Sequence, residues 1–475
     1  MTPEPAAASV APGPVGRARR FDRSIVEGPI APAVWKIAWP TVLQNAIGGL
    51  QGIIDHAMVG HFVGYTANAA IGVSWQIFLV VIVFISSIFT GMGVLVARAA
   101  GANDHDRVDR VVYQAFLVAV LLAVGVLAPT GYIFAPYLLT LVNASPEVMA
   151  HALPFLQTMF LYSIGMLLFF MLGGALRAAG DARTPLRLGV VMTLLNVILN
   201  VVLISGAGPI PALGTRGAAL GTVIASCTVS AAALWMILTG RLVVHFKRGM
   251  SWKPDLAIIR QLFRFGLPAG IQGVAMNVAG VLLLRFIGSL EHSAEAQAAY
   301  AVAYAELFSL ITWTSVGLMG AAAAVAGQNL GAGKPDRSAR AVHLAARIGL
   351  MVAASMAALF LAIPHWLLAI FGIDDPTVVA LGTQLLRYLS VSGFFITVAL
   401  TFTGGLQGTG DTRGPLYITL VSQVVLPMGI CFILQAMNQL TAAGVWTAIV
   451  IGHATRCTLS VWRFEQGKWR TIRVE

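Results

Sequence analysis

The chain has 475 residues, of which 58% are hydrophobic and only 10% are charged, and its mean hydropathy is +0.83. A typical soluble domain carries about 25% charged residues, so this composition excludes a soluble protein and predicts an integral membrane protein. The net charge of +11 would suggest nucleic acid as the partner of a soluble protein. Here the basic residues lie in short connections between apolar runs, and we expect no nucleic-acid partner.

Twelve long apolar runs follow one another along the chain. They are continuous rather than alternating in polarity, which predicts an all-α membrane protein, because lipid offers no partner to exposed backbone polar groups. Each run is long enough to cross about 30 Å of hydrocarbon. The predicted spans are 34–60, 67–97, 111–136, 149–175, 186–205, 214–240, 262–288, 296–327, 343–370, 377–406, 415–436 and 441–463.

The connections between the spans alternate in charge. Those after even-numbered spans carry Lys and Arg, as in Arg98 and Arg107 or Lys334 and Arg337, whereas the odd-numbered connections are nearly bare of both. This bias predicts a multi-pass protein of the cell (inner) membrane with both termini in the cytoplasm.

The same pattern divides the chain into segments. The Pro- and Ala-rich start reads as a mobile tail, and six spans fall on either side of one long basic connection. The predicted organisation is a disordered cytoplasmic tail over 1–30, an N-terminal six-helix bundle over 31–240, a cytoplasmic inter-bundle loop over 241–258, a C-terminal six-helix bundle over 259–464 and a cytoplasmic tail over 465–475.

The chain also contains an internal repeat. The segment Gly-Asp-Ala-Arg-Thr-Pro-Leu at 180–186 returns as Gly-Asp-Thr-Arg-Gly-Pro-Leu at 410–416, and 99–102 returns at 329–332 with the same offset of 230 positions. Two matches at one spacing indicate two copies of one unit. Both copies begin on the cytoplasmic side, so the halves are parallel, and substrate is expected to bind between them.

Two carboxylates lie inside predicted spans, where a charge is costly and normally faces a cavity or a partner. Asp55 in the first span is a candidate for binding a proton or a cation, unless it lies close enough to the outer surface to be solvated. Glu306 in the eighth span is the comparable acid of the second half. A partner such as Arg285 would make its role structural.

Polar residues in other spans are further candidates. Asn196 and Asn200 are four residues apart and share a helical face, and Thr222 lies in the next span. Their oxygens suit a cation, although such residues also join helices by hydrogen bonds. In the second half, Gln272 and Asn277 lie in the seventh span. They too are interpreted either as cation ligands or as residues that join helices by hydrogen bonds.

No motif of a soluble enzyme occurs in the chain, neither a zinc-protease helix nor a nucleophile elbow. We therefore expect no enzymatic activity, no catalytic residue and no cofactor. The chain also lacks a nucleotide-binding P-loop, so transport would have to be driven by an ion gradient.

Several stretches carry a resemblance to a known family. They are Leu176-Arg177 running into Gly180-Asp181, 217–222, the turn 328–334, and 406–412. With Asp55 they make the chain similar to the MATE family of multidrug and toxic compound extrusion transporters. The resemblance implies twelve helices in two pseudo-symmetric six-helix bundles around a central V-shaped cavity. It also implies export of cationic or amphipathic organic compounds by antiport with H+ or Na+.

The resemblance further implies site residues. Asp55 matches the family's first-span carboxylate, and Asn196 and Thr222 match its polar partners, so a Na+ site at these three residues is one expectation. The carboxylate could instead carry a proton. Asn200 stands where one bacterial branch has a second aspartate. The glutamate that another branch has in span 7 is missing, which leaves Asp55 nearly alone.

Other functions remain alternatives. A flippase of a lipid-linked precursor with related architecture should have several basic residues facing the cavity, whereas here the cations keep to the loops. A membrane enzyme would need catalytic residue types clustered within the spans, and none is found. We expect small-molecule substrates, contact with membrane lipid, and a monomer, because each chain would hold a complete cavity.

Overall fold

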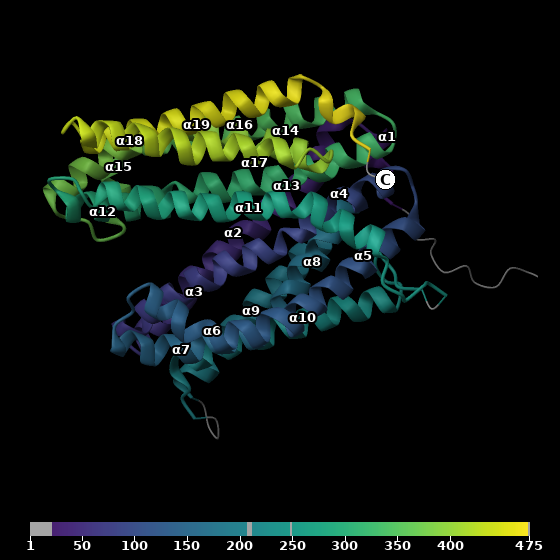
Figure 1. The fold of residues 1–475 in the computed structure, drawn as a ribbon, viewed down its shortest axis with the longest axis horizontal. Helices are drawn as coiled ribbons and strands as arrows, with labels where there is room; N and C mark the ends of the chain where they lie inside the picture. Colours follow the sequence, from purple (N-terminus) through teal and green to yellow (C-terminus); the bar gives the residue numbers. More distant parts are fainter. Residues whose placement is uncertain (1–20, 207–210, 248, 474–475) are drawn as a thin grey trace, which may run out of the picture.

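The computed structural model describes residues 21–206, 211–247 and 249–473. All regular secondary structure within these ranges is helical. Two helical bundles meet toward one end of the molecule and spread apart toward the other (Figure 1). The expected all-α architecture of two bundles around a V-shaped opening is therefore confirmed.

The N-terminal bundle is built mainly from long helices, several of them in two pieces. Its helices are α2 (Ile30–Phe62), α3 (Tyr65–Ser86), α4 (Ile88–Gly101), α5 (His105–Val120), which continues through a π-helical turn (Leu121–Leu127) into α6 (Ala128–Leu141), α7 (Pro146–Leu161), α8 (Ile164–Ala178), α9 (Arg183–Ser205) and α10 (Gly214–Leu238).

The C-terminal bundle repeats this plan. Its helices are α11 (Leu256–Ile287), α12 (Ser293–Tyr300), a π-helical turn (Ala301–Leu307), α13 (Ser309–Gly331), α14 (Pro335–Ala362), α15 (Pro364–Ala369), α16 (Pro376–Gly408), α17 (Arg413–Thr419), a second π-helical turn (Leu420–Val425), α18 (Leu426–Ala436) and α19 (Ala442–Glu465). Three helices begin at aspartates that cap free backbone N–H groups, which are Asp104, Asp255 and Asp375.

The helices account for the twelve spans expected from the sequence. Among the described residues, nine helical segments are long and apolar enough to cross a membrane, and α7 with α8 makes a tenth that is bent by 52°. The remaining two are α2 and α19, which have 33 and 24 residues. Both are long enough to cross a membrane but more polar than the other ten spans. The helix α2 also carries Asp55.

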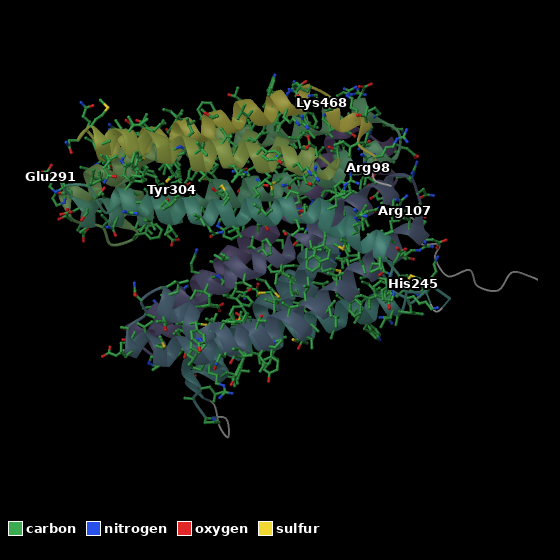
Figure 2. All side chains as sticks on the ribbon, viewed as in Figure 1. Arg98, Arg107, His245, Glu291, Tyr304 and Lys468 are labelled. Carbon is green, nitrogen blue, oxygen red and sulfur yellow. The ribbon has the colours of Figure 1, made fainter. Side chains whose placement is uncertain are left out.

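Charged side chains lie toward the two ends of the molecule. In Figure 2, Arg98, Arg107, His245 and Lys468 lie toward one end, and Glu291 lies at the opposite end. The basic end is also the end where the bundles meet, beside α1 (Ser24–Glu27) and the last residues of the chain (Figure 1).

The bundles touch through a close crossing of α4 and α13. A Cβ added to Gly101 would lie 1.9 Å from the backbone oxygen of Gln328, and one added to Gly331 would lie 2.1 Å from that of Arg98. Gly331 is the repeat counterpart of Gly101, and Gln328 is the counterpart of Arg98. Each half therefore makes the same contact to the other, and only glycine permits the backbones to come this close.

The N-terminal segment differs from the expected tail. Residues 1–20 lie outside the described part of the chain, but residues 21–30 are folded, and Ile25 is completely buried. Lys334 Nζ donates to the Val26 carbonyl at 3.0 Å, and Arg337 donates to the carbonyls of Ile25 and Gly28. The mobile tail expected up to residue 30 is thus wrong for 21–30, because basic side chains of the second half satisfy the backbone of this segment.

Candidate functional site

Three helices of the N-terminal bundle bring the predicted polar residues together. Asp55 on α2 faces α9, where Asn200 Nδ2 donates to its Oδ1 at 2.7 Å. The same nitrogen lies 3.3 Å from the Asn196 side-chain oxygen. Both asparagines are completely buried. Residues from sequence positions about 140 apart therefore form one cluster.

Thr222 on α10 completes this cluster. The Asn196 amide lies 3.0 Å from the Thr222 hydroxyl. With the oxygen and nitrogen of the amide exchanged, its nitrogen donates to Asp55 Oδ1 at 2.9 Å and its oxygen accepts from Thr222. This orientation satisfies both groups. The carboxylate, the two amides and the hydroxyl then form one connected network.

One oxygen in the network is left over. The Asn200 Oδ1 atom is buried and has no hydrogen-bond partner among the described residues. Gly221 makes room for it, since a Cβ at that position would lie 2.0 Å away. The cluster thus offers a carboxylate, a free amide oxygen and a hydroxyl oxygen, which are the donor types that a hard cation prefers. In the chemistry of their oxygens, these residues match the donors of a Na+ site.

Two glutamines extend the polar face of α2. Gln51 lies one turn before Asp55, interacts with its carboxylate and accepts a hydrogen bond from the Thr193 hydroxyl at 2.9 Å. Gln44 lies two turns further back and accepts from Arg177 at 3.0 Å. Neither glutamine was predicted as a site residue. Gln44 and Gln51 lie eleven and four residues before Asp55, and this spacing was the available signal, because it places all three on one helical face.

The candidates of the second half do not form a comparable cluster within the described residues. Gln272 donates to the Thr419 hydroxyl at 2.8 Å and accepts from Gln407 at 3.2 Å. Asn277 donates to the backbone of its own helix, and Gln76 of α3 approaches its oxygen at 3.4 Å. Apart from the bond of Asn277 within α11, these bonds join neighbouring helices.

Glu306 lies apart from these amides, in the π-helical turn Ala301–Leu307. Its side chain is exposed, and among the described residues no ion pair links it to Arg285, which is also exposed. A structural role of Glu306 as the partner of Arg285 is therefore not supported by an ion pair.

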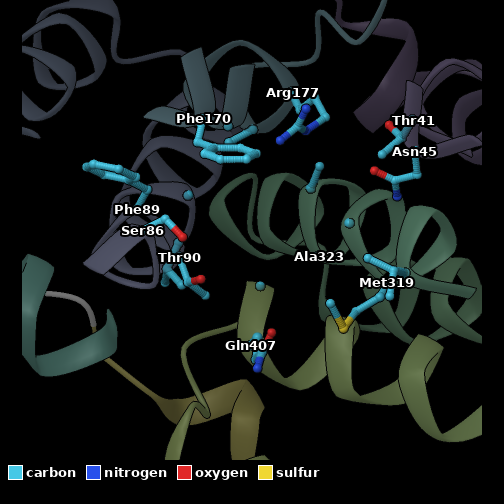
Figure 3. A pocket seen from close by; sticks show the side chains of 18 residues that line it. Thr41, Asn45, Ser86, Phe89, Thr90, Phe170, Arg177, Met319, Ala323 and Gln407 are labelled. Carbon is cyan, nitrogen blue, oxygen red and sulfur yellow. The ribbon is translucent and has the colours of Figure 1, made fainter. Parts of the chain in front are cut away.

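A cavity of about 290 Å³ lies between the two bundles. Figure 3 shows it from close by, with Arg177 and Phe170 on one wall and Gln407 opposite. Its lining comes from both halves and consists of Thr41, Asn45, Ser86, Phe89, Thr90, Gly93, Val94, Phe170, Gly174, Arg177, Ala178, Val316, Met319, Gly320, Ala323, Ala324, Gln407 and Gly408. Arg177 corrects the expectation that the cations keep to the loops. It lies in the last turn of α8, where the span still borders the cavity.

Comparison with protein families identifies two matching regions. The MatE family model matches residues 40–202 and 268–433. The two matches together cover more than half of the chain. They begin and end about 230 residues apart, which agrees with the internal repeat.

Several characterised or named bacterial proteins are similar to this chain. A probable multidrug resistance protein NorM of Thermotoga maritima is 27% identical over 438 residues, which are 91% of this chain and 92% of that protein. The multidrug resistance protein MdtK of Pectobacterium atrosepticum is 25% identical over 90% of this chain and 93% of its own length. The multidrug export protein MepA of Staphylococcus aureus is 24% identical over 89% and 91%.

Solved structures share the fold. An outward-facing multidrug resistance MATE family transporter of the MOP superfamily superposes with a TM-score of 0.86 at 21% identity, covering 94% of this chain and 98% of that one. A MOP superfamily transporter from Pyrococcus furiosus gives a TM-score of 0.85 at 20% identity, with coverage of 94% and 98%. Together with the two matched regions, this likeness shows that the chain is a multi-pass membrane protein that belongs to the MatE family.

Proposed function

We propose that this protein is a secondary active transporter that exports multiple drugs and similar small amphipathic organic compounds, cationic ones included, by antiport with H+ or Na+. Family membership, relatives named for multidrug resistance and export, and the cavity between the bundles support the proposal. We further propose that both termini face the cytoplasm, across the cell (inner) membrane, and that a monomer is the working unit. The segments 31–240 and 259–464 are then the two bodies that rock against each other.

The cluster around Asp55 is the proposed coupling site, and its hydrogen bonds are the observation that carries the proposal. Asn200 donates to the carboxylate at 2.7 Å. A proton or a Na+ ion bound at Asp55 would neutralise the carboxylate, which the uncharged Asn200 amide does not do. The Asn200 amide would then turn away or offer its oxygen to the ion. The contact between α2 and α9 thus depends on ion binding.

The same helix connects this site to the other bundle. One face of α2 contacts α9, and another face packs against α13. A Cβ added to Gly317 of α13 would lie 2.7 Å from Val42 of α2. A shift of α2 at Asp55 therefore reaches the inter-bundle contact through one continuous helix. Packed helices of this kind move between discrete arrangements rather than deforming gradually.

Purified protein in liposomes tests this proposal. Efflux of a cationic dye would be measured under an imposed H+ gradient and, separately, under a Na+ gradient. We expect one gradient to drive export in the wild type and export to be lost in Asp55→Asn. The matched control is Asp374→Asn, which removes an exposed carboxylate. Gradient-driven export that persists in Asp55→Asn would contradict the site and bring Glu306 forward, and export under neither gradient would contradict antiport.

A flippase of a lipid-linked precursor is the second candidate, and the observation in its favour is Arg177 in the cavity wall. A diphosphate headgroup needs several cationic partners. Among the described residues that line this cavity, Arg177 is the single charged one. We therefore favour export of small molecules.

A further inference from the structure

Among the described residues that line the cavity between the bundles, Arg177 is the single charged one. Arg177 extends into it from the last turn of α8 (Figure 3). Its one hydrogen-bond partner among the described residues is the neutral Gln44 oxygen at 3.0 Å, and no ion pair to it occurs there. An arginine stays charged under all ordinary conditions, and a charge withdrawn from water is costly unless an opposite charge meets it. The guanidinium is therefore free to take an anionic partner.

The surroundings of Arg177 suit an aromatic molecule with an acidic group. Phe89 and Phe170 line the same cavity, and Phe170 is 41% exposed. Thr41 and Thr90 also line the cavity, Thr90 near Phe89 and Thr41 beside Asn45 on the other side of Arg177 (Figure 3). Pockets for small molecules commonly combine such aromatic walls with a few polar groups that fix the orientation of the ligand.

The internal repeat makes the cavity asymmetric at one defined position. Arg177 and Gln407 are 230 residues apart, at equivalent places in the two halves, and both line the cavity. One wall thus carries a cation where the other carries a neutral amide. The chain itself shows that glutamine is accepted at this position of the fold, which makes Arg177→Gln a mild substitution.

We propose that this cavity is a subsite for the acidic group of an aromatic amphipathic substrate, with a carboxylate or sulfonate on the Arg177 guanidinium and the ring system against Phe170. The inference rests on the proposed export function and assigns the recognition of acidic groups among its substrates to Arg177. A planar carboxylate can accept two parallel hydrogen bonds from a guanidinium. With one arginine, the subsite takes one negative group.

A matched pair of dyes tests the subsite without any ion gradient. Rhodamine 110 carries a free carboxylate, and rhodamine 123 is its methyl ester, so the two differ only in the acidic group. Binding to the full-length protein in phosphatidylcholine nanodiscs would be followed by fluorescence anisotropy. We expect the acid to bind about tenfold more tightly than the ester, because a charge-assisted bond is gained on one dye only.

Variants separate the charge from the aromatic contact. In Arg177→Gln the two dyes should bind equally, whereas Arg187→Gln, which removes an exposed cation from the same region, should keep the tenfold preference. Phe170→Ala should weaken both dyes and leave their ratio unchanged. In the double variant Arg177→Gln with Gln407→Arg, the charge moves to the opposite wall and the preference for the acid should return.

The outcomes discriminate between the subsite and the transport function. Equal binding of the two dyes to the wild type, or a preference that survives in Arg177→Gln, would overturn the subsite while leaving gradient-driven export of cations intact. Loss of export in Asp55→Asn with an unchanged dye preference supports both. Repeating the titration with phosphatidylglycerol in the nanodiscs tests the other source of an anionic group. Displacement of rhodamine 110 by that lipid would assign Arg177 to lipid headgroups and overturn the proposal.

Discussion

The crossing of α4 and α13 gives a quantitative test of how the two bundles are held together. In Gly101→Ala the new Cβ would lie 1.9 Å from the Gln328 backbone oxygen. A carbon and an oxygen approach no closer than about 3.3 Å without strain. The two helices would therefore have to separate by roughly 1.4 Å, and since the obstacle is backbone, no side-chain rotation relieves it.

The expected cost follows from this overlap. Forced overpacking of a well-packed contact destabilises a protein by about 1–3 kcal/mol. We expect Gly101→Ala to lower the melting temperature of the purified protein by a few degrees in fluorescence-detected thermal unfolding. Gly331→Ala should do the same, because its Cβ would lie 2.1 Å from the Arg98 oxygen in the repeated contact.

Gly93→Ala is the control for this prediction. It lies on the same helix, but its added Cβ would have no neighbouring atom within 4 Å. Alanine favours a helix over glycine by up to about 1 kcal/mol, so this variant should match or exceed the wild type in stability. Equal melting temperatures for Gly101→Ala and Gly93→Ala would refute the close crossing as a tightly packed contact between the halves.

Three further predictions concern polar contacts. Asn200→Ala removes the donor to Asp55 and should abolish gradient-driven export while costing about 1–3 kcal/mol of stability, measured by dye efflux and thermal unfolding; unchanged efflux would contradict a role in coupling. Asp411→Asn breaks the ion pair between Asp411, whose side chain is 5% exposed, and Arg463, and this should clearly lower the melting temperature. Asp336→Asn breaks a pair in which the aspartate is 78% exposed and should have little effect. Arg337→Gln removes donors to the carbonyls of Ile25 and Gly28 and should speed amide hydrogen exchange over residues 23–30, as seen by mass spectrometry; exchange equal to that of the wild type would show that this segment is held by other contacts.

The number and order of the spans could be predicted because membrane helices leave a strong local signal. Long apolar runs and basic connections suffice, even for α2, whose polar residues weaken its apolar character. The grouping of Asn196 with Asn200 also follows from local spacing. Asp55 and Thr222 join this pair only because their helices pack against the helix that carries the asparagines. Local spacing does not show which helices pack together, and only the family resemblance predicted this grouping.

Two features escaped prediction because their meaning depends on the distant half of the chain. Arg177 reads in the sequence as one more basic residue at the end of a span, and only the position of α13 and α16 turns it into part of a cavity wall. Residues 23–28 read as part of a Pro- and Ala-rich tail. Nothing local indicates that Lys334 and Arg337 bind their carbonyls.

That N-terminal segment has a consequence for how the protein is made. Its hydrogen bonds to Asn329, Lys334 and Arg337 span 304 to 312 residues of sequence. At translation rates of about 5–20 residues per second, residues 23–28 wait roughly 15–60 s after leaving the ribosome before their partners exist. These contacts can therefore form only after α13 and the start of α14 have been synthesised. Any fused tag or targeting factor that still holds the N-terminus at that moment competes directly with the docking of this segment.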